Sequence, residues 1–299
     1  MKLLLLGANG QLGRELHRTF AGVIEVKACS RTEVDLTRTQ SMLSALEAFK
    51  PDIIINAAAY TAVDKAESER EQAFNINADA VNFLANEASK RDIWLVHYST
   101  DYVFDGQKDR AYIETDTANP INTYGESKLA GEQAIFASGC KHFIFRTSWI
   151  IGKDGNNFAK TILRLAHERD NLGVINDQHG VPTSPALISK VTKDAIDAIK
   201  KRKDWPSGIY HLAPKGETTW FGVSKVLLNH ANNSNMVLST NVSQLNAIST
   251  TDYPTVAKRP LNSLLNTDKL GQHLSFELPC WTDDFLVTAE SIIKEVKTA

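Results

Sequence analysis

Two side chains four residues apart have the types and spacing needed for acid-base chemistry. Tyr124 and Lys128 fall in residues 123–136, whose pattern predicts a helix, so positions i and i+4 share one face. A phenol with an ordinary pKa near 10 is a poor proton-transfer group at neutral pH. An ammonium ~4–5 Å away, at an effective dielectric constant of ~20, favours the phenolate by roughly 3–4 kcal/mol before desolvation. We therefore expect Lys128 to lower the pKa of Tyr124 by ~2–3 and to make it useful as an acid.

A second group of polar side chains follows an apolar strand predicted at residues 93–98. Ser99, Thr100 and Asp101 come where that strand ends, and open α/β sheets bind ligands at the carboxyl ends of their strands. A hydroxyl pair there and a Tyr-Lys pair on the next helix form the constellation of an extended short-chain dehydrogenase. The sequence thus predicts an enzyme that transfers a hydride and a proton.

A glycine-rich turn near the start predicts where a dinucleotide would bind. Gly7, Gly10 and Gly13 follow an apolar strand and open a helix, an arrangement in which backbone approaches a pyrophosphate at the helix N-terminus. Taken alone, the three glycines also fit a strand-helix turn that binds nothing.

The end of the second predicted strand bears on the choice of cofactor. It has Ser30 and Arg31 where NAD-binding folds often have an acidic residue, and an arginine beside hydroxyls suits a ribose 2′-phosphate, so we expect NADPH, with NADH possible. A solvated surface arginine is the alternative. Asp35 and Leu36 could border the adenine.

The elements that position these groups alternate along the first half of the chain. Strands are expected at residues 2–6, 23–29, 52–57, 93–98 and 141–147, with helices at 39–49, 71–90 and 123–136. Strands separated by helices predict an α/β fold with a doubly wound parallel sheet, a Rossmann fold. We expect a cofactor domain at 1–150 and, interleaved with it, a smaller mixed α/β substrate lobe at 151–299, which holds seven of the nine prolines.

Composition excludes several classes of partner. The 299 residues carry 33 Lys and Arg against 35 Asp and Glu, and a net charge of -2 disfavours nucleic acid and anionic membranes. The leucines at 3–6 stop at Gly7, too soon for a signal peptide. Three widely spaced cysteines fit a reducing compartment, so we expect a cytoplasmic protein. The histidines show no metal-ligand spacing and are expected to be structural.

With these motifs in place, the chain resembles the dTDP-4-dehydrorhamnose reductases along nearly its whole length. The matching stretches are residues 7–15, 56–67, 97–106, 124–132, 146–149, 155–158, 177–183 and 259–263. The resemblance implies hydride transfer from NADPH, or NADH in some members, to C4 of a dTDP-linked keto sugar. It implies that Tyr124 donates the proton, that Lys128 lowers the tyrosine pKa and holds the nicotinamide ribose, and that Thr100 tunes the site.

The resemblance also implies binding residues. Cofactor contacts correspond to Gly10, Gln11, Leu12, Ser30, Asp35, Leu36, Ala59, Tyr60, Thr61 and Tyr98, beside Tyr124 and Lys128. Sugar-nucleotide contacts correspond to Thr100, Asp101 and Trp149. Asn157 and Arg259 are further candidates for the nucleotide end, where an arginine could neutralise a diphosphate.

Two departures from the family pattern concern a metal. Some members form a Mg²⁺-linked dimer through acidic side chains, of which Glu15 matches, but Ala186 and Ser291 stand near the other acidic positions. A hard cation needs several oxygen ligands, so no metal site is predicted and a homodimer is left open. Two alternative functions also remain open: another nucleotide-sugar reductase, epimerase or dehydratase, and a non-catalytic cofactor-binding regulatory subunit.

Overall fold

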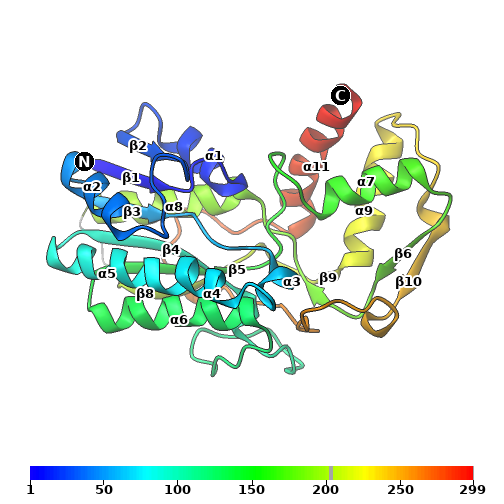
Figure 1. Ribbon diagram of the computed structural model, residues 1–299. Helices are drawn as coiled ribbons and strands as arrows, with labels where there is room; N and C mark the ends of the chain where they lie inside the picture. Colours follow the sequence, from blue (N-terminus) through cyan, green and yellow to red (C-terminus); the bar gives the residue numbers. More distant parts are fainter. Residues whose placement is uncertain (202–204, 299) are drawn as a thin grey trace.

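A six-stranded parallel sheet forms the larger part of the molecule (Figure 1). The computed structural model describes residues 1–201 and 205–298. Strand order is β2-β1-β3-β4-β5-β8, with β1 (Lys2–Leu6) between β2 (Glu25–Cys29) and β3 (Ile53–Asn56), followed by β4 (Trp94–Thr100), β5 (His142–Thr147) and β8 (Gly208–Leu212). The predicted doubly wound sheet is confirmed. The leucines at 3–6 are at most 1% exposed because β1 is covered on both faces.

Helices cover both faces of this sheet and enclose separate apolar cores. On one face, α1 (Gln11–Phe20) and α8 (Pro185–Lys200) pack over Leu3, Leu5 and Phe143. On the other, α2 (Thr39–Phe49), α5 (Ala80–Lys90) and α6 (Thr123–Ser138) pack over Leu4 and Leu6. From β1 the chain adds β2 on one side and β3 to β5 on the other, so the winding of the sheet reverses between β1 and β3, and the carboxyl ends of these parallel strands open a crevice at this switch point.

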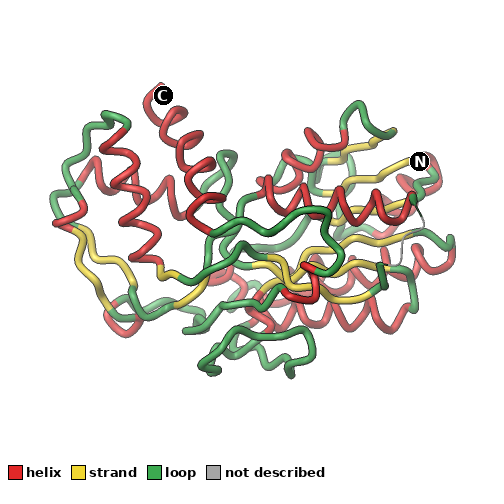
Figure 2. The backbone as a smooth tube through the Cα atoms, turned by 180° about the vertical axis from the view of Figure 1, so that it is seen from behind, coloured by secondary structure: helices red, strands yellow, loops and turns green. Residues whose placement is uncertain are grey.

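A second, smaller lobe stands beside the carboxyl edge of the sheet (Figures 1 and 2). Its core lies among α7 (Phe158–Glu168), α9 (Trp220–Asn233), α11 (Trp281–Thr298) and the parallel pair β6 (Leu172–Ile175) and β10 (Leu245–Ile248). A short antiparallel pair, β7 (His179–Gly180) and β9 (Thr218–Thr219), lies at its base. The second half of the sequence also returns α8 and β8 to the large sheet, so the two lobes are interleaved in the chain.

Residues 71–90, expected as one helix, form three consecutive segments. These are α4 (Arg70–Phe74), the π-helical turn η1 (Asn75–Asp79) and α5. A Cβ on Gly131 of α6 would overlap the carbonyl oxygen of Asn77, so α6 packs directly on the widened turn. Such π turns occur frequently at functional sites.

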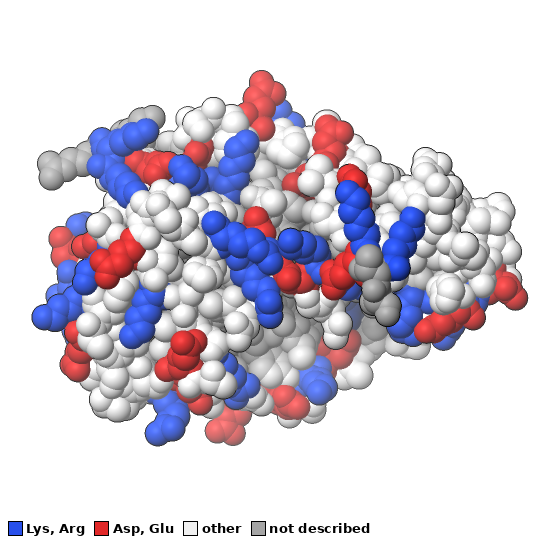
Figure 3. Space-filling model, turned by 90° about the horizontal axis from the view of Figure 1, so that it is seen from above, with Lys and Arg blue, Asp and Glu red and all other residues white. Residues whose placement is uncertain are grey.

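The remaining short segments are α3 (Val63–Ala66), η2 (Asp101–Val103), η3 (Val242–Gln244), η4 (Thr250–Asp252) and α10 (Asp268–Gly271). Basic and acidic side chains are interspersed on the face shown in Figure 3, as the near-zero net charge suggests. Within residues 1–201 and 205–298, no helix combines the length and the apolar character needed to cross a membrane.

Candidate active site

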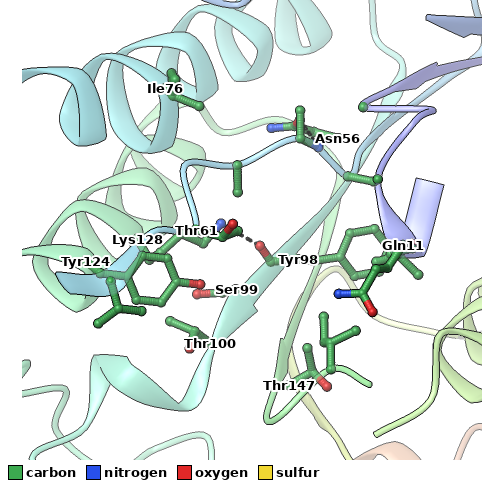
Figure 4. A pocket seen from close by; sticks show the side chains of 18 of the residues that line it. Gln11, Asn56, Thr61, Ile76, Tyr98, Ser99, Thr100, Tyr124, Lys128 and Thr147 are labelled. Atoms are coloured by element: carbon green, nitrogen blue, oxygen red, sulfur yellow. Dashed lines mark hydrogen bonds between the residues drawn. The ribbon is translucent and has the colours of Figure 1, made fainter. Parts of the chain in front are cut away.

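A cavity of about 670 Å³ lies at the carboxyl ends of β1, β3 and β4 and reaches the second lobe (Figure 4). Most of the predicted site residues line it: Gly7, Gly10, Gln11, Leu12, Arg31, Asp35, Leu36, Ala59, Thr61, Tyr98, Thr100, Asp101, Tyr124, Lys128, Trp149 and Asn157. Four predicted residues are not among the lining residues: Gly13, Ser30, Tyr60 and Arg259.

The glycine turn brings backbone to the cavity surface as its sequence predicts. Gly7 has a φ of +81°, and a Cβ there would lie 2.6 Å from the nitrogen of Ala58. A Cβ on Gly13 would overlap the carbonyl oxygen of Gly7, so Gly13 permits α1 to pack against the turn. Gly10 is the N-cap of α1 and has no side chain to cover the first-turn amides. This cradle fits a pyrophosphate.

The part of the cavity lined by Arg31 and Asp35 carries charges of both signs. Arg31 lines the wall beside Asp35, whose carboxylate accepts hydrogen bonds from the backbone amide (3.0 Å) and hydroxyl (2.8 Å) of Thr37. Those bonds hold the pKa of Asp35 below its ordinary value. Ser30 donates both its backbone amide and its hydroxyl to Glu33 at 2.8 Å, so its donors are already engaged.

Tyr124 is placed by the way α6 begins. Asn122 caps the helix, accepting a hydrogen bond from the amide of Gly125 at 2.8 Å. A Cβ on Gly125 would overlap the carbonyl oxygen of Tyr102, so the first turn of α6 lies directly on η2. This contact sets the phenol beside Ser99 and Thr100 (Figure 4).

The expected lowering of the tyrosine pKa is wrong for this structure. Burial raises the pKa of Tyr124, the charge of Asp101 raises it further, and a hydrogen bond with Thr100 opposes both. Lys128 has no part in this balance because its side-chain nitrogen bonds elsewhere. It lies 2.6 Å from the carbonyl oxygen of Tyr98 (Figure 4). It also lies 3.1 Å from Nε2 of His97. Tyr124 is thus a neutral phenol, the state that can donate a proton.

Lys128 is itself strongly affected by its surroundings. The side chain is 1% exposed, and burial lowers its pKa to about 8, while the charge of Glu132 raises it. Glu132 makes a buried ion pair with Arg146 of β5, with nitrogen-oxygen distances of 2.9 and 2.6 Å. Lys128 therefore changes protonation state close to neutral pH.

Thr100 and Asp101 form a bonded pair at the end of β4. The Thr100 hydroxyl donates to Asp101 at 3.1 Å and accepts from the amide of Tyr102 at 3.1 Å. Burial raises the pKa of Asp101 to about 7, and hydrogen bonds from Ser263 and Thr100 oppose that rise. A carboxyl that is partly protonated at neutral pH thus lies beside the phenol.

The second lobe supplies an aromatic wall. Trp149, with a φ of 44°, stacks on Trp220 of α9 with ring centroids 3.7 Å apart, and both line the cavity. Asn157 caps α7 and donates to Gln11 at 3.2 Å. Arg259 instead pairs with Asp64 at 2.8 Å, so its proposed contact with the nucleotide end stays a prediction.

Three buried polar side chains at or beside the cavity have no predicted binding role: Ser99, which the sequence places only in the strand-end hydroxyl pair, Thr147 and Asn77. The hydroxyls of Ser99 and Thr147 are buried without a hydrogen-bond partner in the part of the chain that the structure describes, which suits a polar ligand. Asn77 donates to the carbonyl of Tyr60 (3.0 Å) and to Ser127 (2.9 Å), and accepts from the Tyr60 amide (2.9 Å). It thereby joins the loop after β3 to α6. The sequence signal that could have indicated a role for Asn77 is a polar residue inside an apolar helical pattern.

The residues that match the family's metal positions do not form a metal site. The Glu15 carboxylate pairs with Arg18 at 2.8 Å, while Ala186 and Ser291 offer no carboxylate. Across the described residues, no three His, Cys, Asp or Glu side chains are grouped to hold an ion. We derive no step through Mg²⁺.

Comparison with known proteins gives consistent matches over most of the chain. Residues 1–293 match the family model described as RmlD substrate binding domain. The dTDP-4-dehydrorhamnose reductases of Escherichia coli K12 and Shigella flexneri are 46% and 45% identical over 285 residues, covering 94% of each chain. A structure of dTDP-4-dehydrorhamnose reductase from Bacillus anthracis in complex with NADP has a TM-score of 0.88 and 34% identity, covering 98% of this chain and 99% of that one.

Proposed function

Because the chain belongs to the RmlD substrate binding domain family, we propose that it reduces the C4 keto group of dTDP-4-dehydro-L-rhamnose to give dTDP-L-rhamnose. The observation that carries the proposal is the cavity itself. In one space it joins a dinucleotide cradle, a Tyr-Lys pair with a strand-end hydroxyl, and an aromatic wall from the second lobe. We further propose that this reaction takes place in the cytoplasm, where nucleotide sugars are made.

Tyr124 is the proton donor of this reaction. Reduction of a ketone develops negative charge on its oxygen, and an alkoxide is a stronger base than a phenolate. A phenol with a raised pKa remains protonated until that charge develops and then transfers its proton downhill. The Thr100 hydroxyl orients the phenol and lies within reach of the same oxygen.

The cradle fits a nicotinamide dinucleotide, which supplies the hydride when bound. Gly7 and Gly10 with the first turn of α1 would hold its pyrophosphate, and Ala59 and Thr61 would border the nicotinamide ribose. Lys128 lines the same cavity and would hold that ribose.

The sugar nucleotide would lie on the opposite side of the cavity. Trp149 and Trp220 offer a flat apolar surface, and Asp101 and Thr100 offer polar contacts to the sugar hydroxyls. We assign Asn157 to this end as well, because it lines the cavity where α7 begins.

NADPH is the proposed preferred cofactor, through Arg31. An Arg31→Ala change should raise the KM for NADPH about tenfold while the KM for NADH changes little, since one charge-assisted contact with the 2′-phosphate is lost. Arg38→Ala is the matched control, because Arg38 also lies near Asp35 but does not line the cavity. Equal effects of Arg31→Ala on both cofactors would remove this assignment.

A direct assay tests the proposal. The protein is incubated with dTDP-4-dehydrorhamnose and NADPH, and absorbance of the reduced nicotinamide is followed. We expect substrate-dependent oxidation and formation of dTDP-rhamnose. Folded protein that binds NADPH but oxidises none of it in the presence of this substrate would reject the function.

A further inference from the structure

His97 contacts Lys128 from within the sheet, and the proposed reaction gives it no role. The side chain is 1% exposed in the middle of β4, paired in register with Asn56 of β3 and Ile144 of β5. Its Nε2 lies 3.1 Å from Nζ of Lys128, and its Nδ1 lies 3.3 Å from Nδ2 of Asn56. The ring thus connects the strand end of β3 to the lysine of α6.

The backbone fixes which way the Asn56 amide points. The amide of Ala58 donates to Oδ1 of Asn56 at 3.2 Å, so the NH₂ group of Asn56 faces His97. An NH₂ group only donates, and Nδ1 of His97 must therefore accept. A neutral imidazole has a single acceptor nitrogen, so the ring hydrogen resides on Nε2.

That hydrogen points at the nitrogen of Lys128. An ammonium has three donors and no lone pair, so an N–H of Lys128 would face the N–H of His97 and no hydrogen bond would form between them. A neutral amine has one lone pair that accepts from His97, and it still donates to the carbonyl of Tyr98 at 2.6 Å. A continuous series of donors then runs from Ala58 through Asn56, His97 and Lys128 to Tyr98.

We propose that His97, oriented by Asn56, is a positioning residue that presents an N–H to Lys128 and thereby favours the neutral amine. The proposal deepens the function above and rests on the role given there to Lys128. A neutral amine can take up a proton and release it again, which a permanently charged lysine does not do.

The charges around Lys128 agree with this arrangement. Glu132, one turn further along α6, raises the pKa of Lys128 and so opposes the neutral amine. The carboxylate of Glu132 is, however, held in the ion pair with Arg146 of β5. On β4, the phenol of Tyr98 bonds Thr192 of α8 at 2.8 Å, and the carboxyl of Asp101 and the phenol of Tyr124 lie beyond the strand end. Burial is the main cause that holds the pKa of His97 well below its ordinary value, so the ring is neutral.

Replacing Asn56 by alanine tests the direction of this effect. Without the amide, the His97 ring can carry its hydrogen on Nδ1 and accept from the ammonium at Nε2. Asn56→Ala should therefore raise the pKa of Lys128 by about one pH unit. Loss of a polar neighbour alone would lower that pKa, so the sign separates the two explanations. The pKa is read by NMR of ¹³C-labelled lysines in the protein without cofactor or substrate.

Two further variants show whether the effect passes through His97. In a His97→Leu background, Asn56→Ala should leave the pKa of Lys128 unchanged. Asn86→Ala is the matched control and should have no effect, because Asn86 is a half-buried asparagine on α5 whose side chain, among the residues that the structure describes, bonds to Asn82.

The parent protein gives an independent reading that needs no variant to fold. ¹⁵N NMR of labelled histidines should show His97 with a hydrogen on Nε2 and none on Nδ1. A hydrogen on Nδ1, or a fall in the Lys128 pKa in Asn56→Ala, overturns the proposal. None of these measurements involves turnover, so a protein that fails the reductase assay could still confirm or reject the network.

Discussion

Tyr124 and Tyr102 are neighbouring phenols with different expected roles. Their rings meet edge to face, with centroids 5.8 Å apart, and both line the cavity. Tyr124→Phe removes the proposed proton donor and should lower kcat by about 10²- to 10⁴-fold. Tyr102→Phe is the same change one ring away and should lower kcat less than tenfold. Cofactor affinity, measured by fluorescence, should change little in either variant; similar losses of kcat in both would mean that Tyr124 is not the donor.

Asp101 makes stability depend on pH. Its carboxyl has a pKa of about 7 when folded, well above the ~4 of an unfolded chain, so the folded state holds the proton more tightly. Its contribution to stability is complete below about pH 4 and is lost as pH rises through about 7. Asp101→Asn cannot lose a proton, so its free energy of unfolding relative to the parent should be about 2.5 kcal/mol larger at pH 8 than at pH 5.

Urea denaturation at the two pH values measures this difference. Asp105→Asn is the control, because hydrogen bonds from Tyr112 and Asn119 hold the pKa of Asp105 below its ordinary value. The effect of that substitution should be the same at pH 5 and pH 8. A pH-independent effect of Asp101→Asn would show that the carboxyl stays ionised in the folded protein.

At the level of single residues, the sequence predicted positions better than electrostatic states. Tyr124, Lys128 and Thr100 line the same cavity because strand-end and helix-start positions follow from the alternation of elements. The pKa of Tyr124 could not be predicted, since it depends on how closely α6 lies on η2 and on the direction that Lys128 takes. That direction is set by His97 and the Tyr98 carbonyl, which a one-dimensional pattern does not connect.

Among the elements, the contact between α1 and the glycine turn is the most sensitive to substitution. A methyl group on Gly13 would overlap the carbonyl of Gly7, a backbone atom that cannot move without displacing the cradle. Gly13→Ala should lower the free energy of unfolding by about 1–3 kcal/mol and weaken cofactor binding at least tenfold. Gly271→Ala, at the end of α10, meets nothing within 4 Å and should leave both unchanged. Urea denaturation and cofactor titration of the two variants provide the comparison; normal cofactor affinity in Gly13→Ala would contradict the cradle.

The helix predicted at residues 71–90 shows what periodicity cannot resolve. Apolar spacing correctly predicted a helical segment there. The π turn at Asn75–Asp79 could not be predicted in the same way, because none of its residue types is typical of a π turn. It arises from tertiary packing, because Gly131 admits the Asn77 carbonyl and the Asn77 side chain bonds Tyr60 and Ser127. The boundary between lobes at residue 150 likewise stays a prediction, since α8 and β8 come from beyond it and join the sheet.

Across the whole molecule, one side chain joins the cofactor cradle to the second lobe. Gln11 opens α1, and its Oε1 accepts hydrogen bonds from the amide of Gly152 at 3.0 Å and from Asn157 at 3.2 Å. Gln11→Ala would leave the Gly152 amide unpaired and free the segment between β5 and α7, which borders the sugar-nucleotide end. We expect affinity for both NADP⁺ and dTDP to fall several-fold, because two partly buried hydrogen bonds that hold both ends of the cavity are lost.

Separate titrations of the two ligands test this coupling between lobes. Gln40→Ala on α2 is the control, since among the described residues the Gln40 side chain bonds Ser44, and this variant should bind both ligands as the parent does. Weakened NADP⁺ binding with unchanged dTDP binding would show that Gln11 serves the cradle alone. Loss at both ends would mean that the cavity is shaped jointly by the two lobes, so that substitutions in either lobe alter recognition of both ligands.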